Sequence, residues 1–343
     1  MQLIIHPGYG KCGTSSIQAF LYSNLQYLEK TGIYLPDSNF NFSFERNVKS
    51  FNFSAPNPYF QDLITSRKIS VFEKRIKQVL SQAKKVQCKA ILISSEVLGH
   101  EWSFASAREI HAVFAKYFQE RTVCFYIRRQ DDYLVSSWEQ WYHKVGESLE
   151  SYVNESLQNH SPNYLKIVSF LEECYGPSSL QVFPINREVL IGKNLISDFC
   201  QRINLSIPES LVTDIRTNVG LNPYLCDILY RIPHLYNGHH DYSVKNLLTN
   251  FIGEKDLLLR NGKSILSMSL RRRVVEHFRS DNELLKTKYF NNLSVDEIFG
   301  LNAYAQEPLD NGELRLQIEE LKNVIAIQME LIIHLLKESD KTR

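Results

Sequence analysis

The sequence predicts an α/β fold in which a mostly parallel central sheet carries helices on both faces. Short apolar runs of strand length alternate with longer stretches of helical periodicity, and a glycine-rich loop joins the first strand to the first helix. Residues 37–60 follow neither period and are expected to form a long loop in which short helical turns can occur. The expected strands are residues 3–5, 32–35, 89–96, 122–128 and 180–185, and the main helices of this part are 14–28, 70–86, 105–118 and 191–203.

Composition places the chain among globular proteins. It has 343 residues, of which 43% are hydrophobic and 22% charged, and its net charge of +1 gives no reason to expect nucleic-acid or membrane binding. Six cysteines are scattered without metal-ligand spacing, so reduced and mostly buried thiols are expected. No apolar run reaches the about 18 residues that a membrane span needs. With no secretion signal evident, we expect a cytoplasmic location.

The most informative stretch is the loop that follows the first strand. It reads Gly-Tyr-Gly-Lys-Cys-Gly-Thr-Ser-Ser over residues 8–16. A strand, a glycine-rich loop and a helix together aim free backbone N–H groups and the positive end of a helix dipole at a bound anion. Lys11 adds a positive charge, and Thr14, Ser15 and Ser16 add hydroxyl donors. The loop therefore predicts a phosphate-type anion site.

The spacing differs from that of P-loop NTPases, which need a glycine five residues before a Gly-Lys-Ser/Thr unit. Here Ile5 stands five residues before Gly10, and Cys12 stands where the Mg²⁺ ligand would be. The loop instead resembles the 5′-phosphosulfate loop of sulfotransferases that use 3′-phosphoadenosine 5′-phosphosulfate (PAPS). This resemblance implies a PAPS cosubstrate without a metal, held at its 5′ end by Gly10, Lys11, Cys12, Gly13, Thr14, Ser15 and Ser16.

A second motif follows the fourth expected strand. Arg128 leaves the strand end, and Ser136 lies eight residues further on, inside the next helix. This spacing resembles the 3′-phosphate element of sulfotransferases and implies that both residues hold the 3′-phosphate of PAPS. Arg129 and Gln130 stand where many members have Asp/Asn-Pro, and Arg129 with Ser137 keeps the same spacing, so a shift by one residue stays open. The three arginines at 271–273 are further candidates for phosphate contact.

An acceptor hydroxyl needs a general base, and Glu96 is our choice because it ends the strand expected to lie beside the glycine-rich loop. The resemblance supports this choice, since the equivalent strand end in the family carries a catalytic His or Glu. His6 and His100 are the alternatives. Lys11 would stabilise the negative charge that develops on the departing phosphate.

The resemblance thus implies an enzyme that transfers a sulfuryl group from PAPS to an acceptor hydroxyl. Ser16 stands where cytosolic members carry a tryptophan for adenine contact, so the adenine site is not assigned. The sequence following Gly13 looks more like the bacterial and glycan-modifying branch, which favours a carbohydrate acceptor. The alternatives are a small-molecule P-loop kinase and a non-catalytic nucleotide-binding scaffold.

The C-terminal part is expected to be organised separately. We predict an α/β domain over residues 1–305, a linker over 306–312 and one long helix over 313–338. Apolar residues recur in this helix at alternating steps of three and four, with Gln328 interrupting the row. This pattern fits a helix packed on the domain or a short coiled coil, and self-association is the favoured alternative. The row consists of Leu314, Ile318, Leu321, Ile325, Ile332 and Leu335.

Overall fold

The computed structural model describes most of the chain and divides it into two compact units. Unit 1 comprises residues 1–129, 163–217 and 280–301, and unit 2 comprises 130–162, 218–279 and 302–343. The predicted single domain over 1–305 is thus divided between both units, because the chain passes repeatedly from one to the other. The predicted linker 306–312 lies outside the described residues, which are 1–45, 51–212, 220–252, 265–290, 292–301, 314, 316–318, 320, 321, 323–325, 327, 328, 331, 332 and 335.

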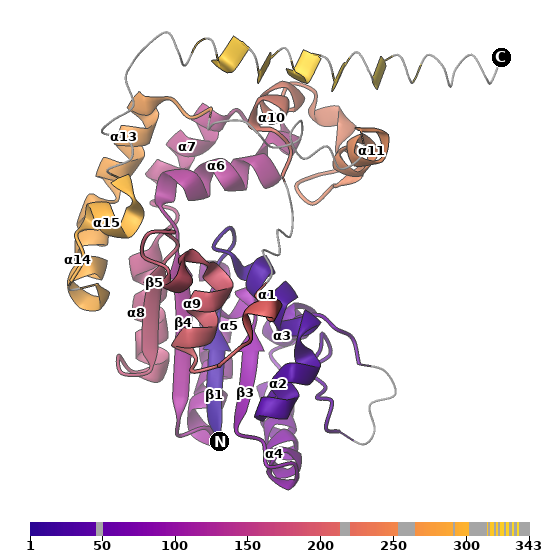
Figure 1. The fold of residues 1–343 in the computed structure, drawn as a ribbon, viewed down its shortest axis with the longest axis vertical. Helices are drawn as coiled ribbons and strands as arrows, with labels where there is room; N and C mark the ends of the chain where they lie inside the picture. Colours follow the sequence, from indigo (N-terminus) through magenta and orange to yellow (C-terminus); the bar gives the residue numbers. More distant parts are fainter. Residues whose placement is uncertain are drawn as a thin grey trace, which may run out of the picture. The chain divides into compact units, whose positions relative to one another are not determined.

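Unit 1 is built on a five-stranded sheet, which confirms the predicted α/β class (Figure 1). The strand order is β2-β3-β1-β4-β5, and every neighbouring pair is parallel. Side chains of the central strands are buried on both faces, as expected for near-continuous apolar runs in a parallel sheet. The strands are β1 (Gln2–His6), β2 (Ile33–Tyr34), β3 (Ala90–Ser94), β4 (Arg121–Ile127) and β5 (Leu180–Pro184).

The order of the strands fixes where a ligand site is expected. β1 lies between β3 and β4, with His6 opposite Ser94 and Ile5 opposite Val123. The chain leaves β1 towards β2 at one end of the sheet, and it leaves β4 towards β5 at the other end. The direction of winding therefore changes between β1 and β4, and ligands of open α/β sheets bind outside the carboxyl ends of strands at such a point.

Two groups of helices cover the sheet and give the predicted three layers. α1 packs against α9, whereas α5 packs against both α4 and α8. Figure 1 shows these groups on opposite faces of the strands. The helices of unit 1 are α1 (Thr14–Ser23), α2 (Leu25–Thr31), α3 (Asn57–Ser66), α4 (Ile69–Lys85), α5 (Phe104–Tyr117), α8 (Tyr164–Tyr175) and α9 (Leu195–Arg202), together with α14 (Arg279–Tyr289) and α15 (Val295–Phe299) near the end of the chain.

The expected loop over residues 37–60 ends in a full helix of 10 residues, where the sequence pattern predicted short helical turns at most. α3 begins at Asn57, with Pro58 in its first turn, and buries Phe60, Leu63 and Ile64. Phe40, which is also fully buried, has its ring 4.8 Å from that of Tyr59 and 5.5 Å from that of Phe60. Phe40 and Phe60 therefore fix the segment to the core, whereas Phe53 is 64% exposed.

Within its described part, unit 2 contains helices joined by turns and loops, and no strand. Trp138 on α6 is fully buried and donates a hydrogen bond from its indole to the carbonyl oxygen of Glu147 at 2.7 Å, so it belongs to the core. The described helices are α6 (Gln130–Gln140), α7 (Leu149–Gln158), α10 (Pro223–Leu229), α11 (Ser243–Ile252) and α13 (Met268–His277).

The cysteines agree with the prediction of reduced thiols. All six are free, and five of them are buried. Across the described residues, no helix combines the length and the apolar character needed to cross a membrane.

His111 of α5 links two parts of the core of unit 1. Its Nε2 donates to the carbonyl oxygen of Leu98 at 2.9 Å, so its Nδ1 accepts the hydrogen bond of the Tyr175 hydroxyl at 2.6 Å. Both ring nitrogens are thus satisfied by the neutral imidazole. Burial lowers the pKa of His111 to about 4.

The lowered pKa of His111 predicts that the protein loses stability in mild acid. An unfolded histidine, with a pKa of about 6.5, takes up its proton earlier than folded His111, so stability is full above pH 6.5 and falls as the pH approaches 4. At pH 5 the loss from this residue is about 2 kcal/mol. Urea unfolding at several pH values measures this loss in the free energy of unfolding. His111→Gln should remove that part of the pH dependence, whereas His234→Gln, at an exposed position, should leave it unchanged.

Candidate active site

The predicted strand, loop and helix are present at the amino terminus. β1 ends at His6, residues 7–13 form the loop, and α1 begins at Thr14. Gly8, Lys11 and Gly13 have positive φ values of 63°, 63° and 73°. The positive φ of Gly13 favours glycine, and a Cβ there would lie 2.3 Å from the Cδ2 atom of Leu195, so any other residue would also have to displace the Leu195 side chain.

The start of α1 offers backbone donors. Gly13 is the N-cap residue, and among the described residues no side chain caps this helix end. The N–H groups of Ser16 and Ile17 bond the Gly13 carbonyl oxygen at 3.0 and 3.1 Å. Thr14 and Ser15 occupy the first two helical positions, whose N–H groups have no acceptor within the helix. These two amides and the helix dipole provide the anion-binding geometry that the sequence predicts.

Two of the predicted loop residues have a different role from the others. The Cys12 amide bonds the Tyr9 carbonyl oxygen at 3.1 Å, and its thiol is buried 3.8 Å from the Tyr164 hydroxyl. Burial raises the pKa of Cys12 to about 12. Thr14 is also buried, and its hydroxyl donates a hydrogen bond to the carbonyl oxygen of Tyr9 at 3.1 Å. Both side chains therefore shape the loop, whereas Gly10, Lys11, Gly13, Ser15 and Ser16 are at least partly accessible.

Glu96 lies beside the loop, as predicted. It follows β3 and begins a short 3₁₀ helix, Glu96–Leu98. A Cβ at Gly8 would lie 3.1 Å from the Glu96 Cγ atom, so the carboxylate stem touches the loop. Burial raises the pKa of Glu96, and this rise is opposed by a hydrogen bond with Thr14 and by the charge of Lys11. A carboxylate with a raised pKa near a cation is typical of a general base.

Arg128 lies at the same edge of the sheet as the loop. It follows β4 directly, and its Nη1 atom donates to the carbonyl oxygen of Lys11 at 3.2 Å. Arg129 is directed elsewhere, with its Nη1 atom 3.5 Å from the Phe299 oxygen and 3.4 Å from the Gly300 oxygen at the end of α15. Of the two arginines left open by the sequence, Arg128 is therefore the one beside the glycine-rich loop.

Ser136 lies in α6 of unit 2, where it is 4% exposed. Its pairing with Arg128 stays a prediction from the sequence. The arginines at 271–273 do not act together: Arg271 is buried and forms an ion pair with Asp131 at 3.4 Å, whereas Arg273 donates to Asn154 at 3.0 Å.

The two histidines considered as alternative bases differ in their surroundings. His6 is fully buried, its Nδ1 lies 2.9 Å from the Ser94 hydroxyl, and burial lowers its pKa to about 3. It is thus a neutral core residue. His100 lies at the loop, where its ring centroid is 5.3 Å from that of Tyr9. Burial lowers the pKa of His100 as well.

Trp102 is a residue of this region that the sequence did not single out. Its ring centroid is 6.1 Å from that of His100, and its side chain is 54% exposed. The turn that carries both residues packs closely against the glycine-rich loop. A Cβ at Gly99 would lie only 2.8 Å from the Gly8 carbonyl oxygen. In the sequence, the only indication that Trp102 belongs to this region is that an aromatic residue follows shortly after the carboxyl end of β3.

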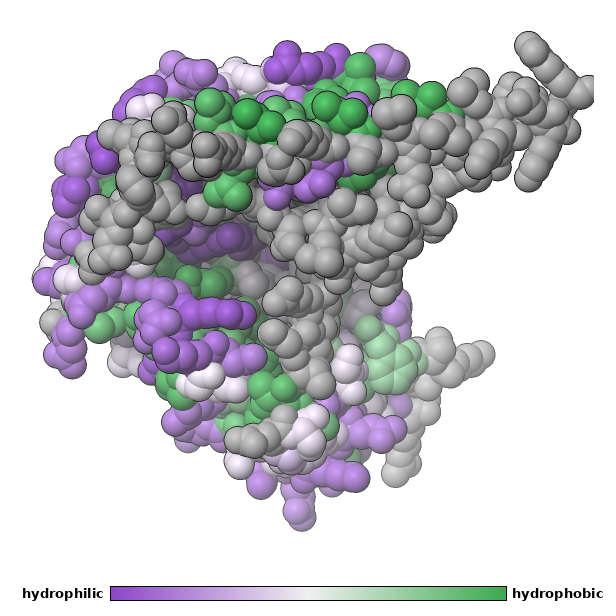
Figure 2. All heavy atoms as spheres, turned by 45° about the horizontal axis from the view of Figure 1, so that its top comes forward, coloured by the Kyte–Doolittle hydropathy of each residue, from purple (hydrophilic) through white to green (hydrophobic). Residues whose placement is uncertain are grey.

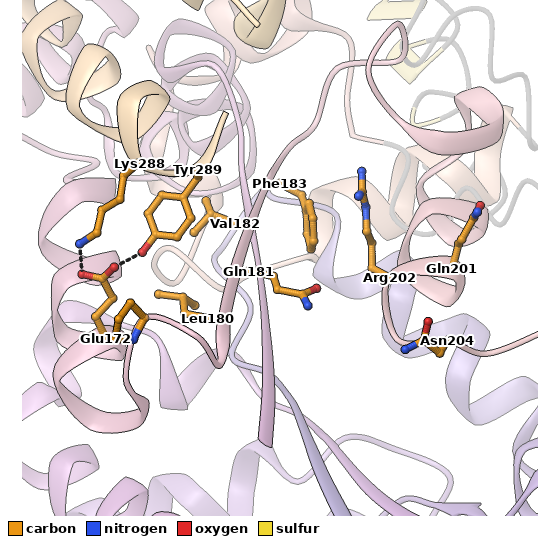
Figure 3. A pocket seen from close by; sticks show the side chains of 11 residues that line it. Glu172, Leu180, Gln181, Val182, Phe183, Gln201, Arg202, Asn204, Lys288 and Tyr289 are labelled. Carbon is orange, nitrogen blue, oxygen red and sulfur yellow. Dashed lines mark hydrogen bonds and ion pairs between the residues drawn. The ribbon is translucent and has the colours of Figure 1, made fainter. Parts of the chain in front are cut away.

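A pocket of about 570 Å³ lies elsewhere in unit 1, along the edge strand β5 (Figure 3). None of the predicted site residues lines it. Lys288 and Tyr289 both bond the Glu172 carboxylate, as the dashed lines in Figure 3 show. Arg202 faces the Phe183 ring at 4.4 Å. Arg202 also forms an ion pair with Asp198 at 3.5 Å, so each charged side chain that lines this pocket already has a partner within the protein. Within the described residues, no group of three or more His, Cys, Asp or Glu side chains is arranged to hold a metal ion.

Comparison with known proteins assigns no family to the chain. No protein-family model and no solved structure matches it. The chain is 26% identical over 175 residues to an uncharacterized protein of Archaeoglobus fulgidus. This match covers 50% of the chain and 46% of the archaeal protein, so the chain spans less than half the length of that relative. The functional conclusion therefore depends on the residues of the site.

Proposed function

We propose that the protein is a PAPS-dependent sulfotransferase. The observation that carries the proposal is the contact between the Arg128 guanidinium and the Lys11 carbonyl oxygen, at 3.2 Å. It brings a second cationic side chain to the anion-binding loop at the point where the winding of the sheet changes direction. PAPS carries two anionic groups on one adenosine, and it therefore needs more than one cationic contact.

The residues present fit the phosphosulfate end of PAPS. Lys11 offers a positive charge, and Thr14 and Ser15 offer the first amides of α1. Arginine has five N–H donors in a planar fork. Arg128 can therefore donate hydrogen bonds to a phosphate of PAPS while it also donates to the Lys11 carbonyl oxygen.

The proposed reaction uses these groups in defined roles. The acceptor oxygen forms a bond to sulfur as the bond between sulfur and the bridging phosphate oxygen breaks, and adenosine 3′,5′-bisphosphate leaves. Negative charge builds on the bridging oxygen, where Lys11 and the α1 amides stabilise it. Glu96 takes the proton of the acceptor hydroxyl, for which its raised pKa suits it near neutral pH.

A carbohydrate is the proposed acceptor class. The exposed indole of Trp102 offers a flat apolar face on the segment that also carries Glu96. The apolar face of a sugar ring stacks on such a surface, while its hydroxyl groups stay free to react.

Binding of adenosine 3′,5′-bisphosphate tests the proposal directly. At a concentration 100 times the Kd, a ligand stabilises the folded state by about 2.7 kcal/mol, so the melting temperature should rise by about 5–10 °C without Mg²⁺. Arg128→Ala should remove most of this shift. Arg129→Ala is the matched control and should keep it, because Arg129 bonds the end of α15 instead. The absence of a shift, or a shift only with Mg²⁺ and ATP, would contradict the proposal and favour the kinase alternative.

A further inference from the structure

The described helical residues between 314 and 335 carry two separate rows of side chains. One row packs within the protein: Val324 is 0% exposed and Ile327 is 2% exposed. Glu320, one turn earlier on this row, accepts a hydrogen bond from the Asn222 side chain of unit 2 at 3.0 Å. The helix is thus attached to its own unit by this row, which comprises Gln317, Glu320, Val324, Ile327 and Leu331.

The second row is exposed. Its six apolar side chains are between 42% (Leu321) and 57% (Leu314) exposed. Large aliphatic side chains so regularly exposed along one helix are unusual in an isolated chain. Figure 2 shows hydrophobic residues in green at the surface along this helix, beside residues drawn in grey. The row comprises Leu314, Ile318, Leu321, Ile325, Gln328, Ile332 and Leu335.

The order of residue types in the exposed row is specific. With Ile318 at heptad position a, every a position is isoleucine, at 318, 325 and 332. Every d position is leucine, at 314, 321 and 335, except for Gln328. Isoleucine at a with leucine at d favours two parallel strands, and one polar residue in the seam fixes the register.

We propose that the exposed row is the seam of a parallel two-stranded coiled coil with a second copy of this chain. An identical partner is indicated by Gln328. In the parallel, in-register arrangement each Gln328 side chain meets its counterpart, and the two amides can bond each other. In any other register the amide would be buried against isoleucine or leucine, which costs stability.

The oligomeric state of the full chain tests the proposal. Light scattering after size-exclusion chromatography should give twice the chain mass of 39.9 kDa. Ile325→Glu places a charge in the seam and should give the mass of one chain. Asn323→Glu is the matched control, because Asn323 is exposed outside both rows, and it should stay dimeric. Far-UV circular dichroism verifies that both variants are folded. A single-chain or four-chain mass for the unaltered protein would overturn the proposal.

Disulfide trapping tests the orientation of the two helices. Leu321→Cys places a thiol at a d position, where two parallel, in-register helices bring identical residues together. Mild oxidation should then give a covalent dimer on a non-reducing gel. Asn323→Cys should not, since it points away from the seam. Equal crosslinking of both variants, or of neither in a dimeric protein, would overturn the parallel arrangement.

Discussion

Replacing Lys11 by alanine is expected to lower kcat for sulfuryl transfer by about 10²–10³-fold, the usual cost of removing one group that stabilises developing charge. Lys11 lies in the loop between β1 and α1, and its charge already acts on the Glu96 carboxylate. Its backbone has a positive φ of 63°, which is equally strained for lysine and alanine, so the substitution changes the charge without a new conformational cost. Transfer of radiolabelled sulfate from PAPS to a panel of glycans measures the effect.

Two controls separate the charge of Lys11 from other effects of the substitution. Lys11→Arg keeps a cation in the loop and should retain more activity than Lys11→Ala. Lys30→Ala removes a lysine at the end of α2 and should leave kcat unchanged. If Lys11→Ala were as active as the unaltered protein while still binding adenosine 3′,5′-bisphosphate, the loop would be a binding element without a catalytic role. Binding of adenosine 3′,5′-bisphosphate without any transfer by the unaltered protein would instead favour a non-catalytic nucleotide-binding protein.

Glu96→Gln is expected to lower kcat by about 10²–10⁴-fold, because glutamine cannot accept the proton of the acceptor hydroxyl. In the unaltered protein, activity should fall as the pH falls through the raised pKa of Glu96 and the carboxylate is protonated. The pH–rate profile of the variant should lack this acidic limb. These measurements use the same transfer assay over a range of pH.

Although Glu96→Gln is expected to lower kcat, it should raise the stability of the folded protein at high pH. The pKa of Glu96 is raised in the folded state, so its contribution to stability is present at low pH and lost as the pH rises through the folded value. Glu96→Gln should therefore be more stable than the unaltered protein at pH 8, and the difference should shrink towards pH 4. A variant that lost stability throughout this range and kept its kcat would identify Glu96 as a structural partner of Lys11 instead.

Much of the fold could be predicted because its signals are local. All five strands appear where apolar runs predicted them, although β2 is only two residues long, Ile33–Tyr34. The full length of α3 does not follow from the pattern, because the helix begins inside the expected loop at Asn57 and most of its buried residues, Leu63 and Ile64, lie beyond residue 60. The division into two units could not be predicted, because each unit is assembled from segments far apart in the sequence.

The positions of the candidate residues could be predicted where backbone geometry decides them, but not where burial decides them. The positions of the loop, of Glu96 and of Arg128 follow from strand ends that meet at one edge of a parallel sheet. The inward direction of Cys12 and the burial of His6 depend on packing by distant residues, such as Tyr164 and Phe199. No single-sequence pattern reports such contacts.

The interleaving of the two units has a consequence for how the protein is made and altered. Unit 1 is complete only when residues 280–301 have been added to its two earlier segments. During synthesis, α14 and α15 can therefore dock on the sheet only after the chain has been made up to residue 301. A single cut of the chain cannot separate one unit intact from the other. A unit therefore cannot be exchanged between proteins by one recombination event.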